Sequence, residues 1–170
     1  MDVRPPAPRA RTLAAAVAAL LLAAGLAGCG SDAPPQVRVH VGSEQLGLEP
    51  TQYCSGGDLH RYDVRPPIIQ AAPGTPVIFT VPDAVAAQGW GVQVFDKTLK
   101  KRLGTVDVAQ GQAVLGRITT SDVVPAAFYL VVVEKHSTQC DNLSGAWPVG
   151  IIRATGVPTF STTSSAPTQG

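Results

Sequence analysis

Short stretches of alternating hydrophobic and polar residues follow one another from residue 37 onward. Val37 to Val41 places three valines on one face and two polar residues on the other, which is the period of a half-buried strand. Trp90 to Phe95 and Gly104 to Val108 repeat this alternation. Phe128 to Val133 has no polar interruption and predicts a strand that is buried on both faces.

Turns rich in glycine and proline separate these stretches, and no helical period of ten or more residues follows the first 28 positions. Glu49 to Cys54 is expected to continue the strand that begins at Gln45, and Asp83 to Gly89 is expected to be a loop. The pattern therefore predicts an all-β fold, an antiparallel β-sandwich over residues 37–156.

The chain opens on a different pattern. Arg9 and Arg11 precede an apolar run from Thr12 to Ala27, which is typical of a secretory signal peptide over residues 1–28, a helix ahead of the β domain. A transmembrane helix is the alternative, but spanning the hydrocarbon core takes about 20 apolar residues, more than this run supplies.

Leu26-Ala27-Gly28-Cys29 resembles the lipobox of bacterial lipoproteins. The resemblance implies that Cys29 carries diacylglycerol, becomes the new N-terminus and holds the chain on the outer face of the plasma membrane. Residues 29–36 would then be a lipidated terminus and spacer, and the uncharged Ser/Thr/Pro-rich residues 157–170 are expected to be a disordered tail. A plain secretory signal followed by a chance cysteine is the alternative.

With Cys29 assigned to the lipid, Cys54 and Cys140 remain, and in an oxidising compartment such a pair predicts a disulfide. A redox or metal role is the alternative. The pair is not the immunoglobulin disulfide, because Thr138 stands where those domains place a tyrosine. The sandwich is expected to be immunoglobulin-like in architecture only.

Three groups of residues suggest chemistry. One group is a weak candidate for a zinc or copper site: Cys54, His60, His136 and Cys140. The alternative is that the cysteines form a disulfide and the two histidines lie on the surface. Trp90, Trp147 and Tyr53 either line a pocket for a small apolar ligand or pack in the core. Lys97, Lys100, Lys101 and Arg102 either meet anionic head groups or wall polymers, or form a solvated turn.

The sequence gives little support for an enzyme. It contains no Gly-x-Ser-x-Gly, Ser-x-x-Lys or His-Glu-x-x-His motif, although Asp58 and Asp63 are a conceivable acid/base pair. Lys and Arg number 13 against 12 Asp and Glu, a balance that excludes the basic footprint of a nucleic-acid-binding protein. We expect no catalytic residue and no cofactor.

Several segments together resemble an actinobacterial lipoprotein family known only as a domain of unknown function. They are the opening Val-x-Val hairpin, Gln52-Tyr53-Cys54, the proline-bounded run from Val77 to Val81, Trp90 to Val94, and the late Cys140. The resemblance implies a secreted, lipid-attached β domain and carries no activity. The expected partners are the membrane, reached through the lipid, and an envelope protein or wall polymer.

Overall fold

The computed structural model describes residues 33–123, 125–135, 140 and 143–154. The expected leader over residues 1–28, Cys29, His136 and the tail over residues 157–170 lie outside the described residues. No helix of the described part is long and apolar enough to cross a membrane.

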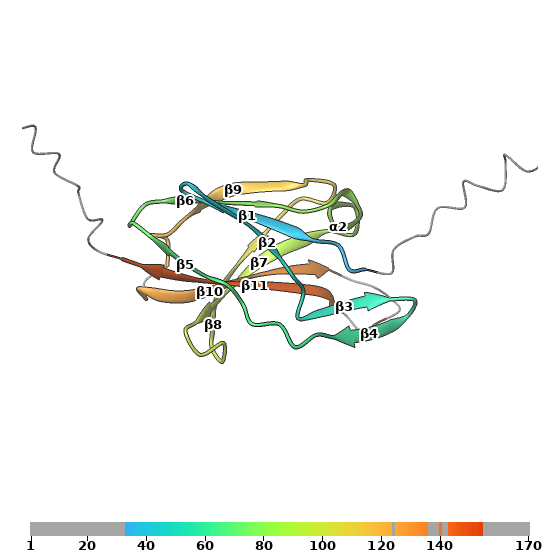
Figure 1. Cartoon of the computed structure of the whole chain (residues 1–170). Helices are drawn as coiled ribbons and strands as arrows, with labels where there is room; N and C mark the ends of the chain where they lie inside the picture. Colours follow the sequence, from blue (N-terminus) through green and yellow to red (C-terminus); the bar gives the residue numbers. More distant parts are fainter. Residues whose placement is uncertain (1–32, 124, 136–139, 141–142, 155–170) are drawn as a thin grey trace, which may run out of the picture. The chain divides into compact units, whose positions relative to one another are not determined.

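Two β-sheets make up the domain, and Figure 1 shows one above the other. The upper one, sheet A, has four antiparallel strands in the order β2-β1-β6-β9. Their bounds are Glu44–Leu48 for β2, Val37–Val41 for β1, Pro76–Thr80 for β6 and Val114–Thr119 for β9.

Sheet B has seven strands, six of them in the order β4-β3-β11-β10-β7-β8. Their bounds are Asp58–Arg61 for β4, Gln52–Ser55 for β3, Leu143–Arg153 for β11, Ala127–Lys135 for β10, Trp90–Asp96 for β7 and Arg102–Asp107 for β8. The seventh, β5 (Ile68–Ala71), pairs with the second half of β11 in parallel, while β3 pairs with its first half. The other pairs are antiparallel, which confirms the predicted β-sandwich.

The core lies between the sheets and consists of side chains at every second strand position. Val37, Val39 and Val41 of β1 are at most 2% exposed and belong to one buried cluster with core positions of β10 and β11. The run from Phe128 to Val133 is buried at five of its six positions, as predicted for a strand with both faces covered. Tyr129 is half-buried.

Two expectations about elements are wrong. Residues from Glu49 onward do not continue β2, because the chain leaves sheet A after Leu48 and enters sheet B at β3. Pro50, which has no N–H for a strand ladder, lies in this crossing, and Thr51 N–H donates to the Ala146 carbonyl of β11.

The expected loop from Asp83 to Gly89 is the short helix α2, Asp83–Gln88. Its small alanine-rich sequence has good helix propensity, and an acidic residue in the first turn suits the helix dipole. Burial of Val85 and Ala86 against the sandwich holds this short helix in place.

Strand direction gives the sandwich two ends. The amino end is where β1, β7 and β11 begin, with α2 and the β3–β4 hairpin, at the right in Figure 1. The carboxyl end is where β11 finishes, with the β7–β8 hairpin and the β9–β10 connection.

Candidate functional site

A disulfide closes the amino end of the domain. Cys54 of β3 is bonded to Cys140, which lies between β10 and β11, with the two Cα atoms 6.1 Å apart. The bond joins residues 86 positions apart in the sequence. The disulfide predicted from the cysteine count is confirmed.

This bond changes the proposed metal set. Both sulfurs are bonded to each other, so neither is a thiolate ligand. His60 is exposed on the edge strand β4, opposite Tyr53, and His136 lies outside the described residues. Within the described part of the chain, no three His, Cys, Asp or Glu side chains are grouped as metal ligands.

The two tryptophans are fully buried, each with its ring N–H bonded to a backbone carbonyl. Trp90 Nε1 donates to the Gln112 carbonyl at 2.6 Å, and Trp147 Nε1 donates to the Pro35 carbonyl at 3.0 Å. Tyr53 packs beside Trp147 with the ring centroids 6.0 Å apart. All three rings therefore belong to the packing of the amino end.

A buried carboxyl group lies among these rings. Glu134 pairs with Trp90 on one side and with Gly145 on the other, and Gly145 pairs with Tyr53, so one row crosses four strands. Glu134 shares the inward parity of Phe128 and the other core positions of β10 and is 3% exposed. Its Oε2 has no hydrogen-bond partner.

Isolation from water has an electrostatic consequence. Burial raises the pKa of Glu134 to about 7, from an ordinary value of 4.5. Burial also raises the pKa of Tyr53, and the Glu134 charge adds to that effect. Glu134 therefore exchanges its proton near neutral pH, unlike a solvent-exposed glutamate.

A second buried polar group without a partner lies beside it. Ser144 occupies the irregular register between the Glu134–Gly145 and Lys135–Leu143 pairs, and its Oγ makes no hydrogen bond. The sequence contains a signal for the inward position of Glu134, because it lies two residues after Val132 and so shares the same face of the strand.

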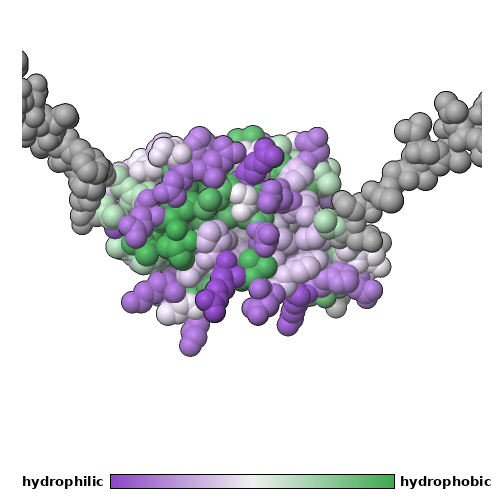
Figure 2. Space-filling model, in the orientation of Figure 1, coloured by the Kyte–Doolittle hydropathy of each residue, from purple (hydrophilic) through white to green (hydrophobic). Residues whose placement is uncertain are grey.

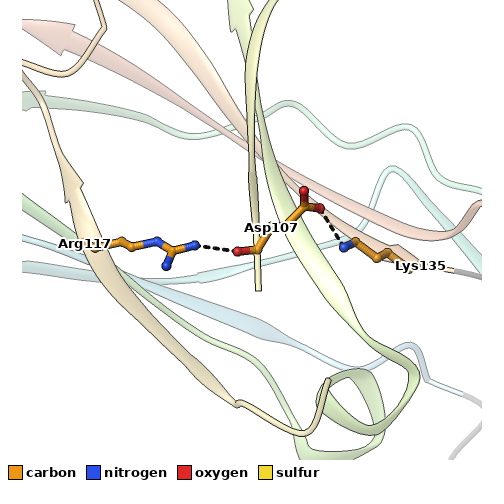
Figure 3. A network of polar contacts seen from close by, with 3 residues as sticks. All are labelled: Asp107, Arg117 and Lys135. Atoms are coloured by element: carbon orange, nitrogen blue, oxygen red, sulfur yellow. Dashed lines mark hydrogen bonds and ion pairs between the residues drawn. The ribbon is translucent and has the colours of Figure 1, made fainter. Parts of the chain in front are cut away.

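Three charged residues join the two sheets along the side formed by β8 and β9 (Figure 3). Lys135 Nζ donates to Asp107 Oδ1 at 2.6 Å, and Arg117 Nη2 of β9 donates to the Asp107 main-chain carbonyl at 2.6 Å. The hydrogen bond from Lys135, together with its charge, lowers the pKa of Asp107. The hydrogen bond from Arg117 connects Asp107, the last residue of β8, to sheet A.

The same side of the sandwich is open at the carboxyl end. A hollow of about 310 Å³ lies there between the first residues of β8, Val94 of β7 and the β9–β10 connection. Its lining is mostly apolar: Val94, Leu103, Gly104, Asp122, Val123 and Pro125. Gly104 faces inward opposite Val94, and a Cβ placed on it would meet no atom within 4 Å.

The wall of this hollow is fixed by the end of β11. Arg153 Nη1 donates to the Thr120 carbonyl at 3.1 Å and to the Val123 carbonyl at 2.9 Å. Asp122 Oδ2 accepts the Thr119 N–H at 2.7 Å within its own turn. These hydrogen bonds hold the β9–β10 connection, which lines one side of the hollow, against the end of β11.

A further apolar area lies on the outer surface at β5. Figure 2 shows hydrophobic surface over this strand, surrounded by hydrophilic side chains. Ile68 is 49% exposed and its tip lies over Gly150, while Ile152 on the neighbouring strand is 39% exposed. Nothing in the structure shows what would cover this area.

Comparison with known proteins adds no relative. No protein-family model, no curated protein and no solved structure matches the chain. The case for a function therefore depends on the residues of this chain alone.

Proposed function

We propose that the protein is an exported lipoprotein, held by Cys29 on the outer face of the plasma membrane, whose β-sandwich is a non-enzymatic binding module of the cell envelope. The observation that carries this proposal is the lipobox-like Leu26 to Cys29 after an apolar leader. The bond between the two remaining cysteines supports it, because structural disulfides are typical of exported domains.

The tie between Pro35 and Trp147 adds a spatial consequence. Five residues separate Cys29 from Pro35, and an extended chain crosses that interval in ~20 Å. Because the Pro35 carbonyl is bonded to a fully buried tryptophan at the amino end, that end would lie close to the bilayer. The carboxyl end, with the apolar hollow, would be free to meet other envelope components.

A second candidate function is the carriage of a small apolar ligand, and the hollow beside Gly104 favours it. Trp90 and Trp147 are themselves fully buried, so this candidate function is argued from the hollow at Gly104. A volume of about 310 Å³ is at the small end of the roughly 300–1,000 Å³ typical of ligand sites.

Metabolic labelling with palmitate tests the anchor. Cells producing the full chain should incorporate label into the protein, and the Cys29→Ser variant should lose both the label and membrane retention. Ser31→Ala, two residues away, is the matched control and should keep both. An unlabelled wild-type protein, or label that persists in Cys29→Ser, would contradict the proposal.

A further inference from the structure

We propose that the carboxyl end binds an anionic amphiphile, with its hydrocarbon chain in the hollow beside Gly104 and its anionic head on the β7–β8 hairpin. This inference names a ligand for the proposed binding role, but it does not depend on the lipid anchor. It joins two independent features, an apolar hollow and a cationic turn, which meet at the start of β8.

The β7–β8 hairpin carries positive charge on a turn that is held by hydrogen bonds. The Asp96 carboxylate accepts the N–H groups of Thr98, Lys100 and Lys101 at 3.0–3.2 Å and the Thr98 hydroxyl at 2.7 Å. Asp96 is thereby committed to holding the turn. The four basic side chains of the hairpin are all exposed, and none forms an ion pair with another described residue: Lys97, Lys100, Lys101 and Arg102.

Exposed apolar side chains lie next to these basic residues in the hairpin. Leu103, which follows Arg102 in the sequence, is 39% exposed and lines the hollow, and Leu99 at the hairpin tip is 41% exposed. Leu99 has φ of 57°, a left-handed conformation that a leucine rarely adopts. A binding surface that is apolar on one side and cationic on the other matches a ligand with a chain and an anionic head.

The alternatives use only part of this surface. A neutral apolar ligand would leave Lys100, Lys101 and Arg102 without a role, and a free phosphate would make no use of the hollow. Asp122, the acidic residue in the lining, accepts a hydrogen bond within its own turn, and the basic hairpin outweighs its charge. The head group is therefore expected at Lys100, Lys101 and Arg102, away from Asp122, whereas Lys97 lines a separate depression beside Ile68.

Calorimetric titration of the purified full chain with dodecyl phosphate, below its critical micelle concentration, tests the site. We expect one molecule bound per chain. Gly104→Leu fills the hollow and should weaken binding at least tenfold. Gly116→Leu is its control, because Gly116 is also a strand glycine whose added Cβ would make only ordinary contacts, with Ile78 at 3.7 Å and 3.9 Å.

Charge reversal gives a second arm that does not touch the core. Lys101→Glu should weaken binding several-fold, whereas Arg61→Glu, an exposed residue of β4 at the amino end, should leave it unchanged. Equal weakening by both reversals would overturn the proposal, since it would indicate nonspecific charge attraction.

Two further outcomes would also overturn it. Wild-type affinity in Gly104→Leu would show that the ligand does not use the hollow. Inorganic phosphate binding as tightly as dodecyl phosphate would show that the hydrocarbon chain of the ligand contributes nothing to binding. Displacement of dodecyl phosphate by an equal concentration of an acidic peptide would assign the surface to a polypeptide instead. Each result stands whether or not Cys29 proves to be acylated.

Discussion

Glu134 lies directly opposite Trp90 in the antiparallel pair of β10 and β7, inside the sandwich and without a partner for its Oε2. Its protonated form is favoured there because an ionised carboxylate in an apolar site has lost its hydration. The folded state therefore holds a proton, between pH 4.5 and about 7, that the unfolded state releases.

This relationship predicts that stability falls as pH rises through that interval. The pKa difference corresponds to about 3 kcal/mol at most, at ~1.36 kcal/mol for each pKa unit. Glu134→Gln should be more stable than the wild type at pH 8, and the advantage should shrink toward pH 4.5. Urea unfolding at a series of pH values measures this.

Glu44→Gln is the control for Glu134→Gln, because Glu44 is exposed at the start of β2. It should leave the shape of the pH profile unchanged. If Glu134→Gln also followed the wild-type profile, burial of the carboxyl group would not be the cause of the pH dependence.

Removing the disulfide should destabilise the domain strongly. The bond closes a loop of 86 residues, for which the chain-entropy model gives about 4 to 5 kcal/mol. Cys54→Ser combined with Cys140→Ser should lower the free energy of unfolding by up to that amount, and the wild type in reductant should behave alike. Unchanged urea midpoints in both experiments would rule out a structural role.

Two strand glycines should respond in opposite ways to alanine. A Cβ on Gly145 would overlap the ring of Trp147, so Gly145→Ala should cost about 1 to 3 kcal/mol of unfolding free energy, as overpacking does. A Cβ on Gly104 meets nothing within 4 Å, so Gly104→Ala should leave stability unchanged or slightly higher. Thermal unfolding of the pair under one condition decides between these outcomes.

Trp147→Phe should loosen the start of β1. Phenylalanine keeps the aromatic packing but leaves the Pro35 carbonyl without its donor, which costs about 1 to 3 kcal/mol if that carbonyl stays buried. Hydrogen exchange of the Val37–Val41 amides should become faster.

The matched control for Trp147→Phe is Trp90→Phe, which removes the bond to the Gln112 carbonyl instead. It should lower global stability without the selective effect on β1. Equal acceleration at β1 in both variants would mean that the Pro35 contact is not the tie.

Much of the fold could be predicted because its signals are local. The alternation in Val37 to Val41 corresponds to the observed buried and exposed positions, and the unbroken run from Phe128 to Val133 is a central strand. The cysteine pair followed from counting, once Cys29 was assigned elsewhere.

Tertiary contacts decide the two elements that the sequence pattern predicted wrongly. The alternation that marks a strand does not say which sheet it joins, so β2 and β3 read as one strand although the chain changes sheets at Pro50. The helix α2 was missed because six residues are too few for a helical period, and burial of Val85 and Ala86 holds it.

The sequence by itself determined the β-rich character of the domain, the inward face of clearly alternating strands such as β1, and the pairing of two cysteines, because period and composition are properties of neighbouring residues. Only the tertiary structure decided that Glu134 Oε2 is buried without a hydrogen-bond partner and that the space beside Gly104 is open. Both features depend on which residues of distant strands pair within a sheet and pack between the two sheets. No single stretch of the sequence specifies that pairing and packing.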